Sequence, residues 1–167
     1  MTIDEVNALS VKDFVEMFSE LYEHSPWIVE RTAQLGPFGD EAHLQSVMTE
    51  VVEAADTDMQ LSLLCAHPEL AGKAAIDKTL TDASTAEQAS AGLDRMSPEE
   101  FEEFHSLNAA YRKRFDFPFI ICVRLTDKPG IMTAMRNRIK NDYTTEFRTA
   151  LDEVSKIAGI RLKEIMS

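Results

Sequence analysis

The feature that most constrains the fold of this chain is a run of apolar residues at helical spacing. Six of them recur at intervals of one to four positions: Leu44, Val47, Met48, Val51, Val52 and Ala55. In an α-helix this spacing places every member on one face, whereas a half-buried strand would bury every second residue. The run therefore predicts an amphipathic helix whose apolar face must be covered by neighbouring elements.

The same helical spacing of apolar residues extends through most of the chain, and several of its runs follow residues that commonly begin a helix. Ser10 and Ser97 precede apolar-periodic runs as candidate N-cap residues, and Pro98 suits a first helical position. The stretch FPFIICVRL at 117–125 is different, because it is apolar, rich in β-branched residues and carries a proline near its start. We therefore expect an all-α fold: a single domain over 1–167 with roughly eight helices and one extended connector.

The charge of the chain excludes several classes of partner. It has 29 acidic and 17 basic residues, which gives a formal net charge of -12. Nucleic acid and anionic membranes would be repelled, so we expect neither as a partner. No apolar run approaches the ~18 residues of a membrane span, and the start MTIDEVNALS has no signal-peptide pattern. We expect a cytoplasmic protein.

Cysteines and sequence motifs limit the chemistry. Cys65 and Cys122 lie in apolar runs and form no C-x-x-C pair, so we expect two reduced core residues. The four histidines show no metal-ligand spacing, and P-loop and dinucleotide motifs are missing. The sequence thus predicts no metal and no cofactor, and side chains alone would have to carry any reaction.

A few polar residues stand where chemistry could occur, and each has a structural alternative. His67 follows an apolar helical run, where it could serve a site or cap the helix carbonyls. Glu87 lies three residues after Ser84, which a capping box alone would explain. Arg161 interrupts the apolar stripe of the last helix, so it needs an acidic partner or a ligand. Asn108 interrupts another stripe, and we expect it to tie down a loop.

Several segments, in order along the chain, resemble one known family. They are HSPWIVER at 24–31, LLCAHPELAGKAA at 63–75, S-x-x-EQ at 84–88, GLD at 92–94, LNAAY at 107–111, FDFPFIICVR at 115–124 and KIAGIRL at 156–162. The set resembles the 2-oxo-4-hydroxy-4-carboxy-5-ureidoimidazoline (OHCU) decarboxylase family. The resemblance implies an all-helical, cofactor-free enzyme, usually a homodimer, that converts OHCU to S-allantoin during urate degradation in purine catabolism.

The resemblance also implies roles for individual residues. His67 and Glu87 would be catalytic, with His67 as proton donor or acceptor. The residues implied to bind substrate are Pro68, Ser84, Thr85, Ala86, Glu87, Gln88, Phe119, Ile120, Ile121, Cys122, Val123 and Arg161. OHCU carries its own electron sink, an imine beside the carbon that loses CO2, so the reaction can proceed without a cofactor of the pyridoxal or thiamine kind. The alternative is a non-catalytic helical module that binds a ureide.

Overall fold

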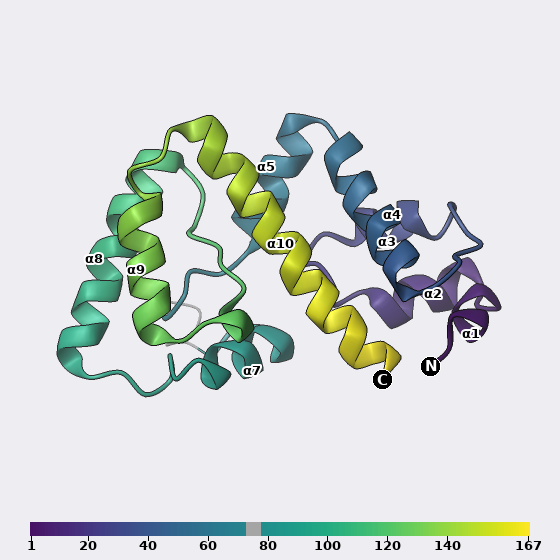
Figure 1. Cartoon of the computed structure of the whole chain (residues 1–167), viewed down its shortest axis with the longest axis horizontal. Coiled ribbons are helices and arrows are strands. Elements are labelled where there is room, and N and C mark those ends of the chain that lie inside the picture. Colours follow the sequence, from purple (N-terminus) through teal and green to yellow (C-terminus); the bar gives the residue numbers. More distant parts are fainter. Residues whose placement is uncertain (73–77) are drawn as a thin grey trace. The chain divides into compact units, whose positions relative to one another are not determined.

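The computed structural model describes residues 1–72 and 78–167 (Figure 1). These residues contain nine α-helices, one short 3-10 helix and no strand. The elements are α1 (Ile3–Asn7), α2 (Val11–Phe18), α3 (Pro26–Thr32), α4 (Glu41–Ala54), α5 (Thr57–Ala66), α7 (Asp82–Ser90), α8 (Pro98–Phe115), η1 (Val123–Leu125), α9 (Lys128–Arg138) and α10 (Tyr143–Met166). The predicted all-α class is confirmed.

The chain divides into two compact units. The first contains residues 1–66 and 155–167, and the second contains residues 67–154, so that α10 contributes to both. In the first unit, α3 packs against α2 and α4. The predicted stripe of α4 is buried from Leu44 to Val52. None of the helices in the described residues is long and apolar enough to cross a membrane.

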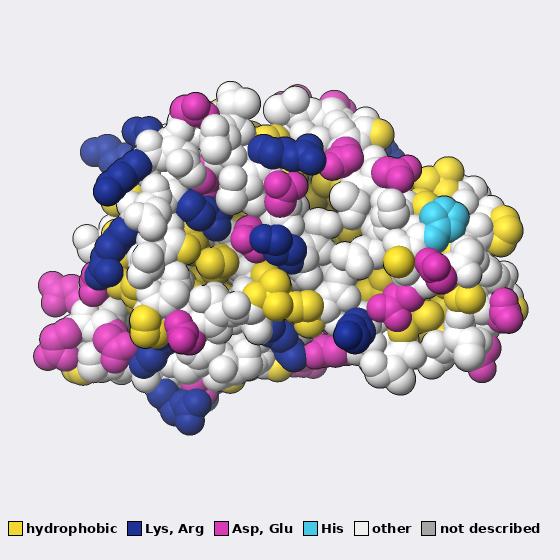
Figure 2. All heavy atoms as spheres, in the orientation of Figure 1, with side chains coloured by type: hydrophobic (Ala, Val, Ile, Leu, Met, Phe, Trp, Pro, Cys, Tyr) yellow, Lys and Arg dark blue, Asp and Glu magenta, His cyan; other side chains and the backbone are white. Residues whose placement is uncertain are grey.

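In the second unit, α8 and α9 lie side by side (Figure 1). Ser97 and Glu100 form the predicted capping box of α8, and Pro98 occupies its first turn. Figure 2 shows acidic side chains over the start of α8 at the lower left and basic ones over its end at the upper left. That arrangement complements the helix dipole. Inside the unit, the rings of Tyr111 and Phe119 meet edge to face, with centroids 5.3 Å apart.

Two local expectations, on the extended connector and on the cysteines, are each confirmed only in part. Residues 117–122 are neither helix nor strand and nearly all buried, which confirms this part of the extended connector predicted over 117–125. Its last three residues instead form the 3-10 helix η1. Shortly after η1, Asp127 caps α9, and its side chain accepts the amide of Gly130. Both cysteines are free thiols, but Cys65 is exposed on α5 and only Cys122 is a core residue.

Candidate active site

The loop that begins at His67 follows the end of α5 and is held by the side chains of Asn108 and Gln88. The helical run stops at Ala66, because the next residue, His67, precedes Pro68 and a residue before proline avoids the helical region. His67 is 8% exposed. Asn108 Nδ2 donates a hydrogen bond to the Leu70 carbonyl at 2.9 Å, so the predicted loop tie is confirmed. The amide of the next residue, Ala71, donates to Gln88 Oε1 at 3.0 Å. The loop after His67 is thus fixed by buried side chains of α7 and α8.

The start of α7 differs from the expectation. Thr81 is the N-cap, and its hydroxyl accepts the amide of Ser84 at 3.2 Å. Ser84 is therefore inside the helix, and Glu87 lies beyond the first turn. The capping-box interpretation of Glu87 is wrong, because a capping-box carboxylate must reach back to the N-cap amide. A positive φ of 76° at Gly92 ends the helix, with the next amide bonded to the Gln88 carbonyl at 3.0 Å.

One face of α7 buries polar side chains. Ser84, Glu87 and Gln88 fall at i, i+3 and i+4 and are 5%, 8% and 5% exposed. Burying a carboxylate, an amide and a hydroxyl on one face is costly unless polar groups meet them. Thr85 and Ala86, also implied to bind substrate, are exposed. The face that carries Glu87 has the chemistry expected of a polar binding site.

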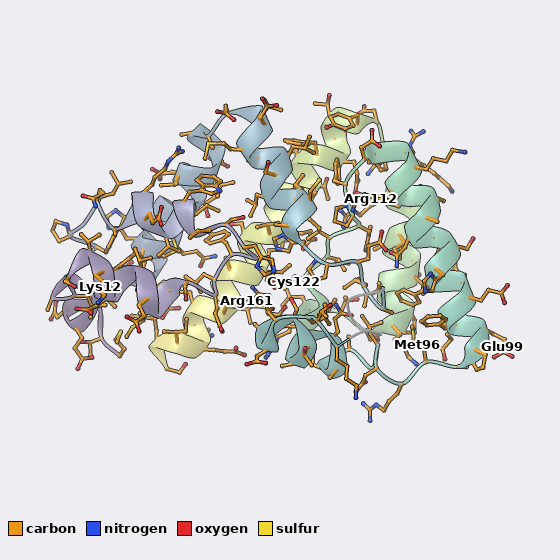
Figure 3. All side chains as sticks on the ribbon, turned by 180° about the vertical axis from the view of Figure 1, so that it is seen from behind. Lys12, Met96, Glu99, Arg112, Cys122 and Arg161 are labelled. Carbon is orange, nitrogen blue, oxygen red and sulfur yellow. The ribbon has the colours of Figure 1, made fainter. Side chains whose placement is uncertain are left out.

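The segment 119–123 lies close to this face of α7. Phe119, Ile120, Cys122 and Val123 are buried, Ile121 is half-buried, and η1 packs against α7. Burial raises the pKa of the Cys122 thiol, and the carboxylates of Glu153 and Glu87 raise it further. Figure 3 shows Cys122 in the interior and Glu99 at the outer edge of α8. The second unit thus brings the Glu87 carboxylate within electrostatic range of the implied pocket segment.

Two charged residues at this segment were not singled out by the sequence. Arg138 Nη1 donates to the Ile120 carbonyl at 2.7 Å, and the Cys122 amide donates to Glu153 Oε2 at 3.2 Å. Both lie on helices with other charged residues around them, α9 and α10. No sequence signal separates them from their exposed neighbours.

Arg161 belongs to the first unit, where it is 6% exposed. Its Nη2 donates to Glu23 Oε1 at 2.9 Å, and its Nη1 donates to the Glu20 carbonyl at 3.0 Å. Of the two alternatives predicted for Arg161, an acidic partner or a ligand, the structure shows the acidic partner. The implied contact of Arg161 with substrate stays a prediction.

A pocket of about 710 Å³ opens along another face of α7, at positions 82, 85 and 89, and along the start of α8. Gln88 and Ala71 line it, so the hydrogen bond that holds the loop after His67 lies in its wall. Leu93, Met96 and Phe101 give it an apolar side. Among the described residues, no cluster of three or more His, Cys, Asp or Glu side chains could hold a metal ion.

Comparison with known proteins gives matches over the whole chain. A model of the OHCU decarboxylase family matches residues 7–163. A Haloferax volcanii protein named 2-oxo-4-hydroxy-4-carboxy-5-ureidoimidazoline decarboxylase is 46% identical over 167 residues, 100% of this chain and 97% of that protein. The Bacillus subtilis uric acid degradation bifunctional protein PucL is 40% identical over 99% of this chain, which spans 33% of PucL.

Solved structures agree on the fold. A crystal structure of (S)-allantoin synthase matches with a TM-score of 0.79 and 30% identity, over 100% of this chain and 54% of that one. A crystal structure of OHCU decarboxylase in the presence of (S)-allantoin matches with a TM-score of 0.70 over 86% of this chain and 92% of that one. At 21% identity, the second match shows the fold alone.

Proposed function

This chain belongs to the OHCU decarboxylase family and is a carboxy-lyase, and from that premise we propose that it converts OHCU to S-allantoin. The observation that carries the proposal is the family match over 7–163, together with 46% identity to a named decarboxylase over all of this chain and 97% of that protein. We also propose that 1–167 acts as one decarboxylase domain, since the family match includes residues of both units.

The chemistry needs orientation and proton transfer. When the C4–carboxylate bond breaks, CO2 leaves and the bonding pair forms a C4=C5 double bond. The former C5=N pair moves to nitrogen, which takes up a proton. C5 is then protonated, and the C4 hydroxyl loses its proton to become a carbonyl. The substrate thus serves as its own electron sink, so we propose that no cofactor takes part.

The proposed roles follow from the side chains in the second unit. His67 transfers protons, because an imidazole titrates near neutrality and can act as acid or base. Glu87 orients His67 or accepts hydrogen bonds from ureido N–H groups, and its burial strengthens such contacts. Protonation of C5 from one fixed side would give a single enantiomer. Because the (S)-allantoin synthase match covers the full chain, we propose the S product.

Main-chain groups of Ile121 are further candidates for substrate contact. Ile121 is half-buried, and its amide and carbonyl form no hydrogen bond within the described residues. Peptide groups that become buried, as these would under a bound ligand, need a hydrogen-bond partner. A ureide offers N–H donors and C=O acceptors side by side, so it can satisfy both groups of Ile121 at once.

The test is turnover of freshly generated OHCU, followed by circular dichroism as optically active allantoin forms. His67→Ala should lower the rate roughly 10²–10⁴-fold, the range of general acid–base catalysis. Glu87→Gln should lower it as well. The matched controls are His105→Ala and Glu99→Gln on α8, both of exposed residues, and these should keep the wild-type rate. Removal of metals by chelation should also leave the rate unchanged.

The experiment also separates the enzyme from a non-catalytic ureide binder. Racemic allantoin forming at the uncatalysed rate with wild-type protein would favour the binder. A binder should still melt at a higher temperature with allantoin, since a ligand at 100 times its Kd adds roughly 2.7 kcal/mol.

We further propose a homodimer located in the cytoplasm. The dimer rests on the family resemblance, and the location rests on the two cysteines, which form no disulfide and suit a reducing compartment. Light scattering that gives the mass of one chain at micromolar concentration would contradict the dimer. A fluorescent fusion recovered outside the cytoplasm would contradict the location.

A further inference from the structure

Two charged side chains hold the peptide groups on both sides of Ile121. Arg138 Nη1 donates to the Ile120 carbonyl at 2.7 Å, and Glu153 Oε2 accepts the Cys122 amide at 3.2 Å. Both bonds involve a charged group, which makes them stronger than bonds between neutral groups. The two anchors come from α9 and α10, while the segment they hold has no helix or strand of its own.

Because each peptide group is planar, these two hydrogen bonds also fix the directions of the Ile121 amide and carbonyl. The Ile120 carbonyl and the Ile121 amide belong to one trans peptide plane, where C=O and N–H point in opposite directions. The Ile121 carbonyl and the Cys122 amide share the next plane. Fixing the Ile120 oxygen therefore fixes the direction of the Ile121 N–H, and fixing the Cys122 amide fixes that of the Ile121 C=O.

Arg138 is itself held on several sides. Its Nε donates to Glu146 Oε1 at 2.7 Å, and its guanidinium carbon lies 4.3 Å from the centre of the Phe119 ring. Glu146 is fully buried, and it also accepts the Tyr111 hydroxyl at 2.6 Å and the Asn141 amide at 3.1 Å. A guanidinium confined by a carboxylate, an aromatic face and a carbonyl has little freedom to move. The Ile120 carbonyl is thus fixed to the core of the unit.

We propose that Arg138 and Glu153 are positioning residues that aim the Ile121 amide and carbonyl at the ureide of the substrate. The inference rests on the proposed function, because it takes OHCU as the ligand of this segment. Neither side chain needs to touch substrate. Both act through the main chain, where a displacement of about 1 Å can cost 10²-fold in rate.

The test compares two pairs of variants in the full chain. Arg138→Met and Glu153→Ala each remove one anchor and should lower kcat/KM for OHCU roughly 10- to 100-fold. Arg138→Lys and Glu153→Gln keep a donor or an acceptor and should restore part of that loss. The matched controls are Arg136→Met on α9 and Asp152→Asn on α10, since both residues are exposed, and they should keep the wild-type value.

A second readout does not depend on activity. Amide hydrogen exchange, followed by NMR without ligand, should be faster at Cys122, whose amide bonds to Glu153, in Glu153→Ala and in Arg138→Met, while the amides of α8 stay protected. A purely structural role would raise exchange throughout the unit. Wild-type kinetics and unchanged Cys122 exchange in both variants would overturn the inference while leaving the proposed function intact. If wild-type protein fails to turn over OHCU, the proposed function fails, and the exchange data still decide whether Arg138 and Glu153 fix the segment around Ile121.

Discussion

Two arginines, buried Arg161 in the first unit and largely buried Arg138 in the second, share the same kind of environment. Arg161 donates to the Glu23 carboxylate and to the carbonyl of Glu20. Arg138 donates to the Glu146 carboxylate and to the carbonyl of Ile120. Their side chains are 6% and 11% exposed. In both units a guanidinium joins a buried carboxylate to a main-chain oxygen.

The shared main-chain contact shows what these arginines contribute. Glu20 lies in the connection between α2 and α3, and Ile120 lies in the extended segment before η1. Carbonyls in such irregular stretches have no helical partner and must find another donor when buried. An arginine can satisfy the carbonyl and a carboxylate together. The two arginines therefore make the same kind of contacts, and the units differ mainly in the other groups that surround the carboxylate.

The largest effect should come from removing the guanidinium that donates to the buried carboxylate of Glu23. Arg161→Met keeps the length of the side chain but leaves a carboxylate that is 3% exposed without its guanidinium. Removing one partner of a buried ion pair costs about 3–5 kcal/mol. Urea unfolding should show that loss, and Lys163→Met, at an exposed position of the same helix, should show almost none. A loss under about 1 kcal/mol would mean that the pair behaves as a surface salt bridge.

Arg138→Met should destabilise the protein less, by about 1.5–3 kcal/mol. The reason is that Glu146 keeps two donors, the Tyr111 hydroxyl and the Asn141 amide. The measurement is the same urea titration with Arg136→Met as its control. If Arg138→Met proves as costly as Arg161→Met, the additional donors around Glu146 do not compensate, and the comparison of the two networks fails.

Tyr111→Phe should have a smaller effect, about 1 kcal/mol for one hydrogen bond. Burial raises the pKa of Tyr111, and the Glu146 carboxylate raises it further, so the phenol stays a donor at all ordinary pH values. Because Tyr111 and Arg138 donate to the same oxygen, the double variant should lose more than the sum, by about 0.5–3 kcal/mol. Additive losses would show that the two donors act independently.

The two arginines also show what a sequence can reveal. Arg161 was visible because it breaks an apolar helical stripe, a position where a charge must find a partner. Arg138 lies among other basic residues at the end of α9, where a solvated side chain is the ordinary interpretation. Its importance depends on a carbonyl 18 residues away in the chain. Helical periodicity predicted most of the fold, but contacts of this kind arise only when the elements pack.

The candidate site, like the fold, was predicted from the sequence only in part. Family resemblance singled out His67 and Glu87, but the local interpretation of Glu87 was wrong. Ser84 and Glu87 have capping-box spacing, and the helix instead begins three residues earlier because Thr81 caps it. Thr81 and Ser84 are both good N-cap residues and lie three positions apart, so the sequence alone does not show which of them begins the helix. The structure separates them, since Ser84 is buried and Thr81 accepts its amide.

The smallest effect concerns the cysteines, which again contrast the two units. Cys65 is exposed in the first, whereas burial and the carboxylates of Glu153 and Glu87 raise the pKa of Cys122 in the second. A raised pKa leaves less thiolate at pH 8, so iodoacetamide should label Cys65 first by mass spectrometry. Glu87→Gln removes one of the charges that disfavour the thiolate, so it should lower the pKa of Cys122 and speed its labelling slightly, with Cys65 unchanged as internal control. Equal labelling of Cys122 in Glu87→Gln and wild type would mean that the carboxylate is too far from the extended segment to share a substrate with it.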